Sequence, residues 1–162
     1  MTTFTIATPD EMVELGARLA TELRAGDLIA LNGELGAGKT TLTRGLGAAL
    51  GVRGTVTSPT FVLARTHQRV SGGAPLVHVD AYRLSSPAEL DDLDIDYAAS
   101  IVVVEWAAGM LDGLTDDWLE LTIVRPMGSG DSDALDDEDV AEPREVTITG
   151  HGDRWAGYAP VR

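Results

Sequence analysis

The segment 33–40 has the residue types and spacing of a phosphate-binding loop, or P-loop. It reads Gly-Glu-Leu-Gly-Ala-Gly-Lys-Thr and matches the pattern G-x-x-x-x-G-K-S/T at every fixed position. Glycines let the backbone wrap so that successive N–H groups point at phosphate oxygens, and the start of the following helix adds its positive dipole end. In such a loop Lys39 reaches the β and γ phosphates, and the Thr40 hydroxyl ligates Mg²⁺. The residues expected around the nucleotide are Gly33, Glu34, Leu35, Gly36, Ala37, Gly38, Lys39, Thr40 and Thr41.

Lys39 is the only lysine in the chain, and every other cationic side chain is an arginine. A guanine-specific GTPase usually reads its base with an Asn/Thr-Lys-x-Asp motif, which would need a second lysine. The sequence therefore favours ATP over GTP as the nucleotide.

Two apolar segments end in a carboxylate that could serve the Mg²⁺ ion of such a nucleotide. Ile-Val-Val-Val at 101–104 precedes Glu105, which gives the Walker B pattern with Glu in place of Asp, and Leu-Val-His-Val at 76–79 precedes Asp80. The carboxyl ends of parallel strands meet at one edge of a sheet, so both acids are expected beside the P-loop. We assign Glu105 to the metal with Thr40, and Asp80 either to supporting the groups that bind the metal or to positioning the attacking water. The exchanged assignment stays open, and either acid could instead cap the turn that follows it.

Three further features lie near these motifs. The hydroxyl-rich turn at 57–61, Thr-Ser-Pro-Thr-Phe, is placed where a nucleotide-sensing loop could lie, although its composition is that of an ordinary turn. Trp106 could stack on a ligand or partner, or be a half-buried core residue. His78 is expected within the sheet, where it orients its neighbours.

Alternating helices and strands predict an α/β fold that positions these residues. Apolar periodicity predicts a helix over 9–23 with Thr8 as its N-cap. A second helix over 40–50 ends at Gly51, and its Gly45 and Gly47 predict close packing on the sheet, because each costs about 1 kcal/mol relative to Ala. A third helix is expected over 87–99. The predicted strands are 27–32, 61–65, 76–79, 101–104, 119–124 and 145–149.

These elements predict a P-loop NTPase-like fold, with a mostly parallel sheet, helices on both faces and an antiparallel C-terminal strand pair. The length of 162 residues is that of about one domain. The segment 127–143 contains seven acidic residues and no basic residue, so we expect it to be a disordered loop between the final strands.

Charge and composition exclude several classes of function. The absence of cysteine excludes disulfides, thiolate catalysis and Cys-ligated metals, and the three histidines are too scattered to form a metal site. A net charge of −14 argues against nucleic-acid binding by the general surface, although residues 35–79 carry five basic and no acidic side chains. With no signal-peptide pattern and no apolar run of about 18 residues, we expect a cytoplasmic protein without membrane contact.

Four ordered motifs resemble those of the bacterial TsaE (YjeE) family, over about residues 8–125. They are Gly33-Glu34-Leu35-Gly36-Ala37-Gly38-Lys39-Thr40-Thr41, Ser58-Pro59-Thr60-Phe61, His78-Val79-Asp80-Ala81-Tyr82-Arg83 and Glu105-Trp106. The resemblance implies the ATPase component of the machinery that makes threonylcarbamoyladenosine in tRNA. It further implies a small P-loop fold, ATP and Mg²⁺ binding, and weak hydrolysis coupled to the partner proteins TsaD and TsaB.

Transferred position by position, the resemblance places residues 35–40 around the phosphates and Thr40 with Glu105 on Mg²⁺. It makes Lys39, Asp80 and Glu105 the catalytic set, and it ties Asp80 and Trp106 to turnover or partner coupling. Glu34 replaces the family's usual Asp. The acidic segment resembles an insertion before Arg144, a candidate nucleotide contact. Contact with tRNA is expected to be indirect, through the partners or the arginine-bearing segment.

Two other functions fit the same motifs. A small-molecule kinase uses a P-loop and magnesium-binding acids equally well, but such enzymes add a substrate domain and an arginine-bearing lid for which this chain lacks room. A nucleotide-gated adaptor, in which hydrolysis only resets binding to a partner, is the third possibility.

Overall fold

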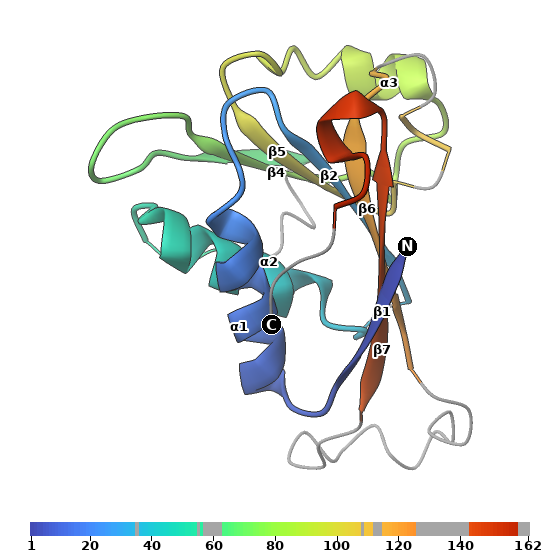
Figure 1. Ribbon diagram of the computed structural model, residues 1–162. Helices are drawn as coiled ribbons and strands as arrows, with labels where there is room; N and C mark the ends of the chain where they lie inside the picture. The colour runs from blue at the N-terminus through green and yellow to red at the C-terminus, as the bar shows by residue number, and fades with distance from the viewer. Residues whose placement is uncertain are drawn as a thin grey trace.

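The computed structural model describes residues 1–34, 36–54, 56, 63–107, 109–111, 115–125 and 143–158. Within them, seven strands form one sheet in the order β1-β7-β6-β2-β5-β4-β3 (Figure 1). The strands are β1 Thr2–Ile6, β2 Leu28–Gly33, β3 Ala64–His67, β4 Leu76–Asp80, β5 Ile101–Glu105, β6 Trp118–Val124 and β7 Arg144–His151. The predicted turn at 57–61 lies outside the described residues, as does the acidic segment 127–143 except for its last residue.

The four central strands, β6, β2, β5 and β4, run parallel to one another. Strands β2, β5 and β4 are nearly continuous apolar runs, as expected for strands that are covered on both faces, whereas β6 alternates buried and partly exposed residues. The strands toward both edges are antiparallel, and the pairing of β6 with β7 confirms the predicted C-terminal pair. Strand β2, which leads into the P-loop, is thus central in the sheet. Strand β5 pairs with it, and β4 pairs with the other edge of β5.

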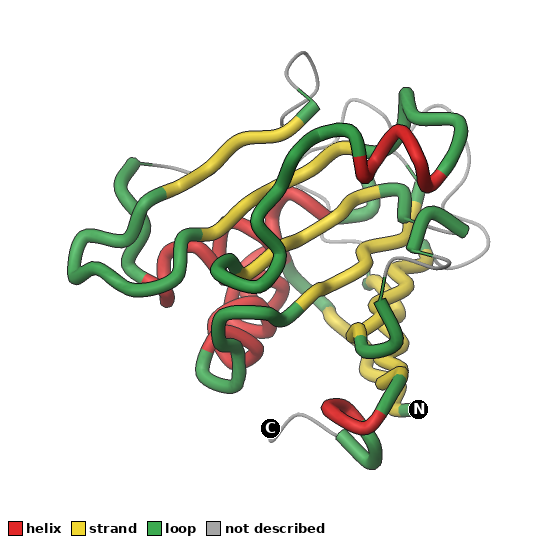
Figure 2. Tube along the Cα trace, turned by 90° about the horizontal axis from the view of Figure 1, so that it is seen from above, coloured by secondary structure: helices red, strands yellow, loops and turns green. Residues whose placement is uncertain are grey.

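Helices cover both faces of the sheet, as predicted, but unequally. The 12-residue helices α1 (Pro9–Ala20) and α2 (Lys39–Leu50) lie on one face, and the short helix α3 (Pro87–Asp91) lies on the other (Figure 2). Each face has its own apolar cluster, to which successive residues of a strand contribute alternately. In β2, for example, Ile29 and Leu31 belong to the cluster under α1 and α2, whereas Leu28 and Ala30 belong to the other.

The ends of α1 and α2 follow local sequence signals. The Thr8 side chain accepts a hydrogen bond from the Glu11 N–H at 3.2 Å, and the Glu11 carboxylate accepts one from the Ala7 N–H at 2.7 Å, so two donors at the helix start are satisfied. Gly51 ends α2 in the left-handed region, with φ 73°. Both predicted caps are therefore confirmed.

The prediction that Gly45 packs on the sheet is wrong, because α2 packs on α1 at this position. A Cβ at Gly45 would lie 2.1 Å from the Val13 carbonyl oxygen, and one at Gly16 of α1 would lie 2.1 Å from the Leu42 carbonyl oxygen. A glycine in each helix therefore allows the two backbones to approach. Gly47, in contrast, faces Val56, Val52 and Leu76 of β4.

Three other predicted elements have different boundaries. The helix predicted over 9–23 ends at Ala20. The predicted helix over 87–99 ends at Asp91, and Asp94 has a left-handed φ of 55°. In a helix over 87–99, Asp91 and Asp94 would be like-charged neighbours three positions apart, and so would Asp92 and Asp96 four positions apart, which disfavours the longer helix. The strand predicted over 61–65 is described at Ala64–His67. Strand β1 was not predicted, although Thr-Thr-Phe-Thr-Ile alternates polar and apolar residues as a strand does. It pairs with β7.

Candidate nucleotide-binding site

Strand alternation gathers the candidate side chains of β4 and β5 on the face covered by α2. Ile101 and Val103 belong to the cluster under α1 and α2, and Glu105 continues that alternation along β5. On β4, Leu76 belongs to the same cluster and is followed at two-residue steps by His78 and Asp80. Asp80 and Glu105 are register partners, so the two predicted acids lie side by side at the carboxyl edge of the sheet.

The P-loop connects β2 to α2, and two of its glycines have backbone conformations that other residues rarely adopt. Gly36 has φ 79° and Gly38 has φ 115°, both in the left-handed region. Gly38 is also the N-cap of α2, and it has no side chain that could accept from the first N–H groups of the helix. These groups lack intrahelical acceptors and are available to an anion. Leu35, one of the predicted phosphate-contact residues, lies outside the described residues.

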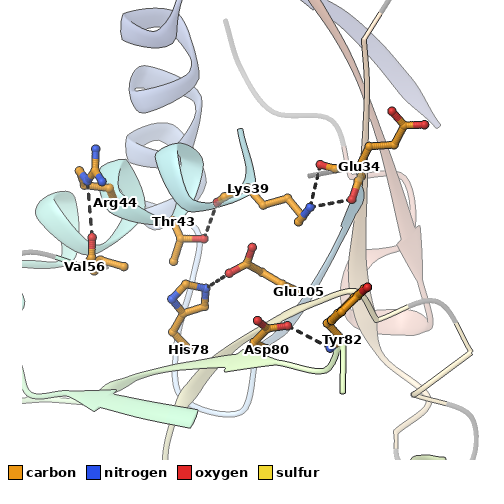
Figure 3. A network of polar contacts seen from close by, with 10 residues as sticks. Glu34, Lys39, Thr43, Arg44, Val56, His78, Asp80, Tyr82 and Glu105 are labelled. Atoms are coloured by element: carbon orange, nitrogen blue, oxygen red, sulfur yellow. Dashed lines mark hydrogen bonds and ion pairs between the residues drawn. The ribbon is translucent and has the colours of Figure 1, made fainter. Parts of the chain in front are cut away.

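The Lys39 side chain lies folded against its own loop (Figure 3). Its ammonium donates to the Gly33 carbonyl at 2.6 Å and to the Glu34 carbonyl at 3.0 Å. The same nitrogen lies 3.9 Å from the centroid of the Trp106 ring, a cation–π contact. The Glu34 carboxylate points away from Lys39, so Glu34 contributes its backbone to this contact and not its charge.

Burial and nearby carboxylates act on Lys39 in opposite directions. Its removal from water lowers the pKa of the ammonium, while Glu105 and then Asp80 raise it. Burial is the largest of these effects, so the pKa lies below its usual value. The two acids therefore help to keep the cation charged at a site where a phosphate would need it.

Glu105 is buried, 4% exposed, and is held by His78 of the neighbouring strand. His78 Nε2 and Glu105 Oε2 are 2.5 Å apart. Asp80 is partly exposed, and its Oδ1 accepts a hydrogen bond from the Tyr82 N–H at 2.9 Å. Asp80 thus caps the turn after β4, the alternative left open by the sequence, and still lies next to Glu105.

Comparison with known proteins gives the family. The family described as "Threonylcarbamoyl adenosine biosynthesis protein TsaE" matches residues 6–130. The tRNA threonylcarbamoyladenosine biosynthesis protein TsaE of Streptomyces coelicolor is 59% identical over 148 residues, which cover 90% of this chain and 94% of that protein. The protein of the same name from Bacillus subtilis is 35% identical over 150 residues, which cover 91% of this chain and 84% of that protein. This chain belongs to the TsaE family.

A solved structure gives the same conclusion about the fold. The crystal structure of Bacillus subtilis YdiB superposes with a TM-score of 0.72 at 28% identity, covering 96% of this chain and 88% of that chain. The family resemblance and the P-loop NTPase-like fold predicted from the sequence are both confirmed.

Trp106 of this TsaE-family chain has a strained backbone and two aromatic or cationic neighbours. Its φ of 60° lies in the left-handed region, which is uncommon for a large side chain. Its ring lies 5.1 Å from that of Tyr82, in addition to its contact with Lys39. Tyr82 is 68% exposed, so this aromatic pair extends from the P-loop lysine to the surface.

Arg144 contacts the P-loop of this TsaE-family chain from β7. It donates from Nε to the Ala37 carbonyl at 3.2 Å and from a terminal nitrogen to the Gly36 carbonyl at 3.5 Å. The sequence suggested Arg144 as a nucleotide contact. The observed contact is with the loop backbone. It depends on the pairing of β7 with β6, which brings residue 144 beside residues 36 and 37.

The oxygen-rich composition of the site fits Mg²⁺. Among the residues that the structure describes, no group of three or more His, Asp or Glu side chains could hold a metal by itself. Mg²⁺ does not need such a group, because it usually binds one or two carboxylates together with substrate phosphates and water. In the same described ranges, no helix is long and apolar enough to cross a membrane.

Proposed function

We propose that this chain is the ATP-binding and ATP-hydrolysing component of the machinery that makes threonylcarbamoyladenosine in tRNA. The observation that carries the proposal is the juxtaposition, at one edge of the sheet, of a glycine-rich loop with its lysine and a buried carboxylate on the adjacent strand. Family membership supports the assignment to this pathway, and the juxtaposition supports ATP binding and hydrolysis.

Phosphate binding would use the backbone first and Lys39 second. Residues 33–41 would surround the phosphates, with N–H groups from the loop and the first turn of α2 directed at the oxygens. Lys39 would exchange its two carbonyl acceptors, Gly33 and Glu34, for β- and γ-phosphate oxygens. A phosphate carries a full negative charge and a carbonyl only a partial one, so this exchange favours binding.

Thr40 and Glu105 are the residues that would hold Mg²⁺. When bound, the ion neutralises charge that develops on the β and γ oxygens. Glu105 would supply the oxygen that His78 does not engage, and Thr40 its hydroxyl. Asp80 would orient the attacking water with Oδ2, because its Oδ1 is engaged by the Tyr82 N–H.

The catalytic set would thus be Lys39, Asp80 and Glu105, and we propose that hydrolysis by the isolated protein is weak. Productive turnover would require the partners TsaD and TsaB. Direct tRNA binding is disfavoured by the net charge of −14, so tRNA would be reached through the partners, in the cytoplasm.

The test is a calorimetric titration of ATP with Mg²⁺, followed by hydrolysis assays with and without TsaD and TsaB. Lys39→Ala should abolish binding. Glu105→Gln should remove the Mg²⁺ dependence of binding, and Asp80→Asn should leave that dependence intact while slowing hydrolysis. The reverse pattern for the two acids would assign the metal to Asp80. Absence of any ATP binding by the folded wild type would refute the proposal.

A further inference from the structure

His78 is a buried polar side chain that the proposed chemistry does not use directly. It lies in the middle of β4, is fully buried, and points toward Glu105 (Figure 3). Burial of an imidazole among apolar strands is unfavourable unless its nitrogens are hydrogen-bonded. Its one hydrogen bond within the described part of the chain is to the carboxylate that we propose as the metal ligand.

The sheet register places these two side chains within reach of each other. His78 is the register partner of Val103, and Glu105 lies two residues further along the same face of β5. Diagonal neighbours of this kind are close enough for long side chains to meet. The result is a contact of 2.5 Å between His78 Nε2 and Glu105 Oε2, buried under α2.

The two nitrogens of His78 differ in a way that defines the direction of this bond. Nε2 faces a carboxylate, which only accepts hydrogen bonds when ionised, whereas Nδ1 is buried with no partner among the described residues. A proton on Nε2 therefore makes a charge-assisted bond, and a proton on Nδ1 would be left without an acceptor. The arrangement favours the tautomer with its proton on Nε2.

Glu105 has a competing partner in Lys39. The carboxylate raises the pKa of the Lys39 ammonium, so the two groups attract each other across the site. The described residues nevertheless contain no Lys39–Glu105 ion pair, because the ammonium donates to the Gly33 and Glu34 carbonyls while Glu105 is held by His78. In Figure 3 the second oxygen of Glu105 points away from the imidazole.

We propose that His78 is a positioning residue for the metal-binding carboxylate. Its Nε2–H fixes Glu105 Oε2, which keeps Oε1 available to Mg²⁺ and prevents the carboxylate from pairing with Lys39. This inference rests on the proposed function, since it concerns the same metal site. Groups that orient a metal ligand typically change metal affinity or activity by about 10–100-fold when removed.

The main test compares His78→Leu with His78→Gln. Leucine fills the space without a donor, and the amide nitrogen of glutamine can replace Nε2–H. We expect His78→Leu to raise the Mg²⁺ concentration for half-maximal ATP binding by about tenfold or more, with ADP affinity in EDTA unchanged. His78→Gln should restore the Mg²⁺ dependence to within about threefold. His151→Leu, beside Glu120 at the end of β7 and away from the P-loop, is the matched control and should leave it unchanged.

The outcomes separate this inference from the proposed function. A wild type that binds no ATP with Mg²⁺ refutes the function. A wild type that binds, together with a His78→Leu variant of unaltered Mg²⁺ dependence, refutes only the role of His78. A purely packing role would change nucleotide affinity equally with and without Mg²⁺, and glutamine would not rescue it.

A measurement on the unaltered chain keeps the inference testable even if His78→Leu does not fold. Nitrogen-15 NMR of the metal-free protein should show the His78 proton on Nε2, with a coupling or shift that changes in Glu105→Gln. A proton on Nδ1 in the wild type would overturn the proposal, since Nε2 could then not donate to Glu105.

Discussion

Two buried carboxylates at opposite ends of the central strands have opposite surroundings. Asp27 immediately precedes β2 and is 5% exposed, and Glu105 ends β5 and is 4% exposed. Arg154 donates to both oxygens of Asp27, at 3.1 and 3.0 Å, and the Arg24 N–H donates to Oδ2 at 2.8 Å. Arg154 also donates to the Glu22 carbonyl at 2.7 Å, so this cluster ties the segment after β7 to the start of β2.

Glu105 is held at only one oxygen. Its hydrogen bond is to His78, and the described residues offer no donor to Oε1. Equal burial therefore has two different consequences. A carboxylate with both oxygens engaged fixes the fold, whereas a carboxylate with one engaged oxygen is oriented and can still bind a ligand.

Glu105→Gln should have the largest effect on activity. Loss of the negative oxygen should slow Mg²⁺-dependent ATP hydrolysis by about 10²–10³-fold, the range typical for removal of one preorganised electrostatic group. Because glutamine keeps the shape and can still accept from His78, the thermal midpoint should change little. Hydrolysis assays and thermal unfolding on the same samples check this. A large loss of stability in Glu105→Gln, with hydrolysis intact, would contradict the contrast drawn between Glu105 and Asp27.

Arg154→Ala should have the reverse profile. Removal of this guanidinium leaves Asp27 buried and unpaired, which should lower the free energy of unfolding by about 3 kcal/mol. ATP and Mg²⁺ binding should be unchanged below the transition, because Arg154 lies at the far end of β2. Urea unfolding gives the free energy, and Arg18→Ala, in an exposed pair with Glu14, is the matched control with an expected change below about 1 kcal/mol.

The single lysine allows the charge coupling at the Glu105 end to be measured directly. Glu105 raises the pKa of Lys39 against the effect of burial, so Glu105→Gln should lower that pKa further. NMR titration of the one lysine Nζ signal reports the change without overlap from other lysines. Asp27→Asn should not move the signal, and a shift of equal size in that variant would show that the two ends are coupled.

The smallest expected effect concerns Tyr158, which packs near Arg154. Burial, followed by Glu22, raises the pKa of its hydroxyl to about 12, against the lowering effect of Arg154. A pKa above the unfolded value of about 10 means that stability is fully present below pH 10 and is lost as the pH rises toward 12. Tyr158→Phe should reduce the decrease in the free energy of unfolding between pH 10 and pH 12. An unchanged pH dependence would assign the loss to another group.

The sequence alone determined the features that depend on local residue order. The P-loop, both helix caps and the two apolar strands ending in Asp80 and Glu105 follow from spacing and residue type, because caps, turns and strand periodicity are set within a few residues. Four motifs in order were likewise sufficient to indicate the TsaE family, which the comparisons confirmed.

Only the tertiary structure decided which distant groups meet. The pairing of His78 with Glu105 depends on the register of β4 against β5, and a shift of one residue would place His78 on the opposite face. The contact of Arg144 with the P-loop spans 107 positions of sequence and exists because β7 pairs with β6. The packing of Gly45 on α1 depends in the same way on a neighbour far along the chain, and no local pattern specifies it.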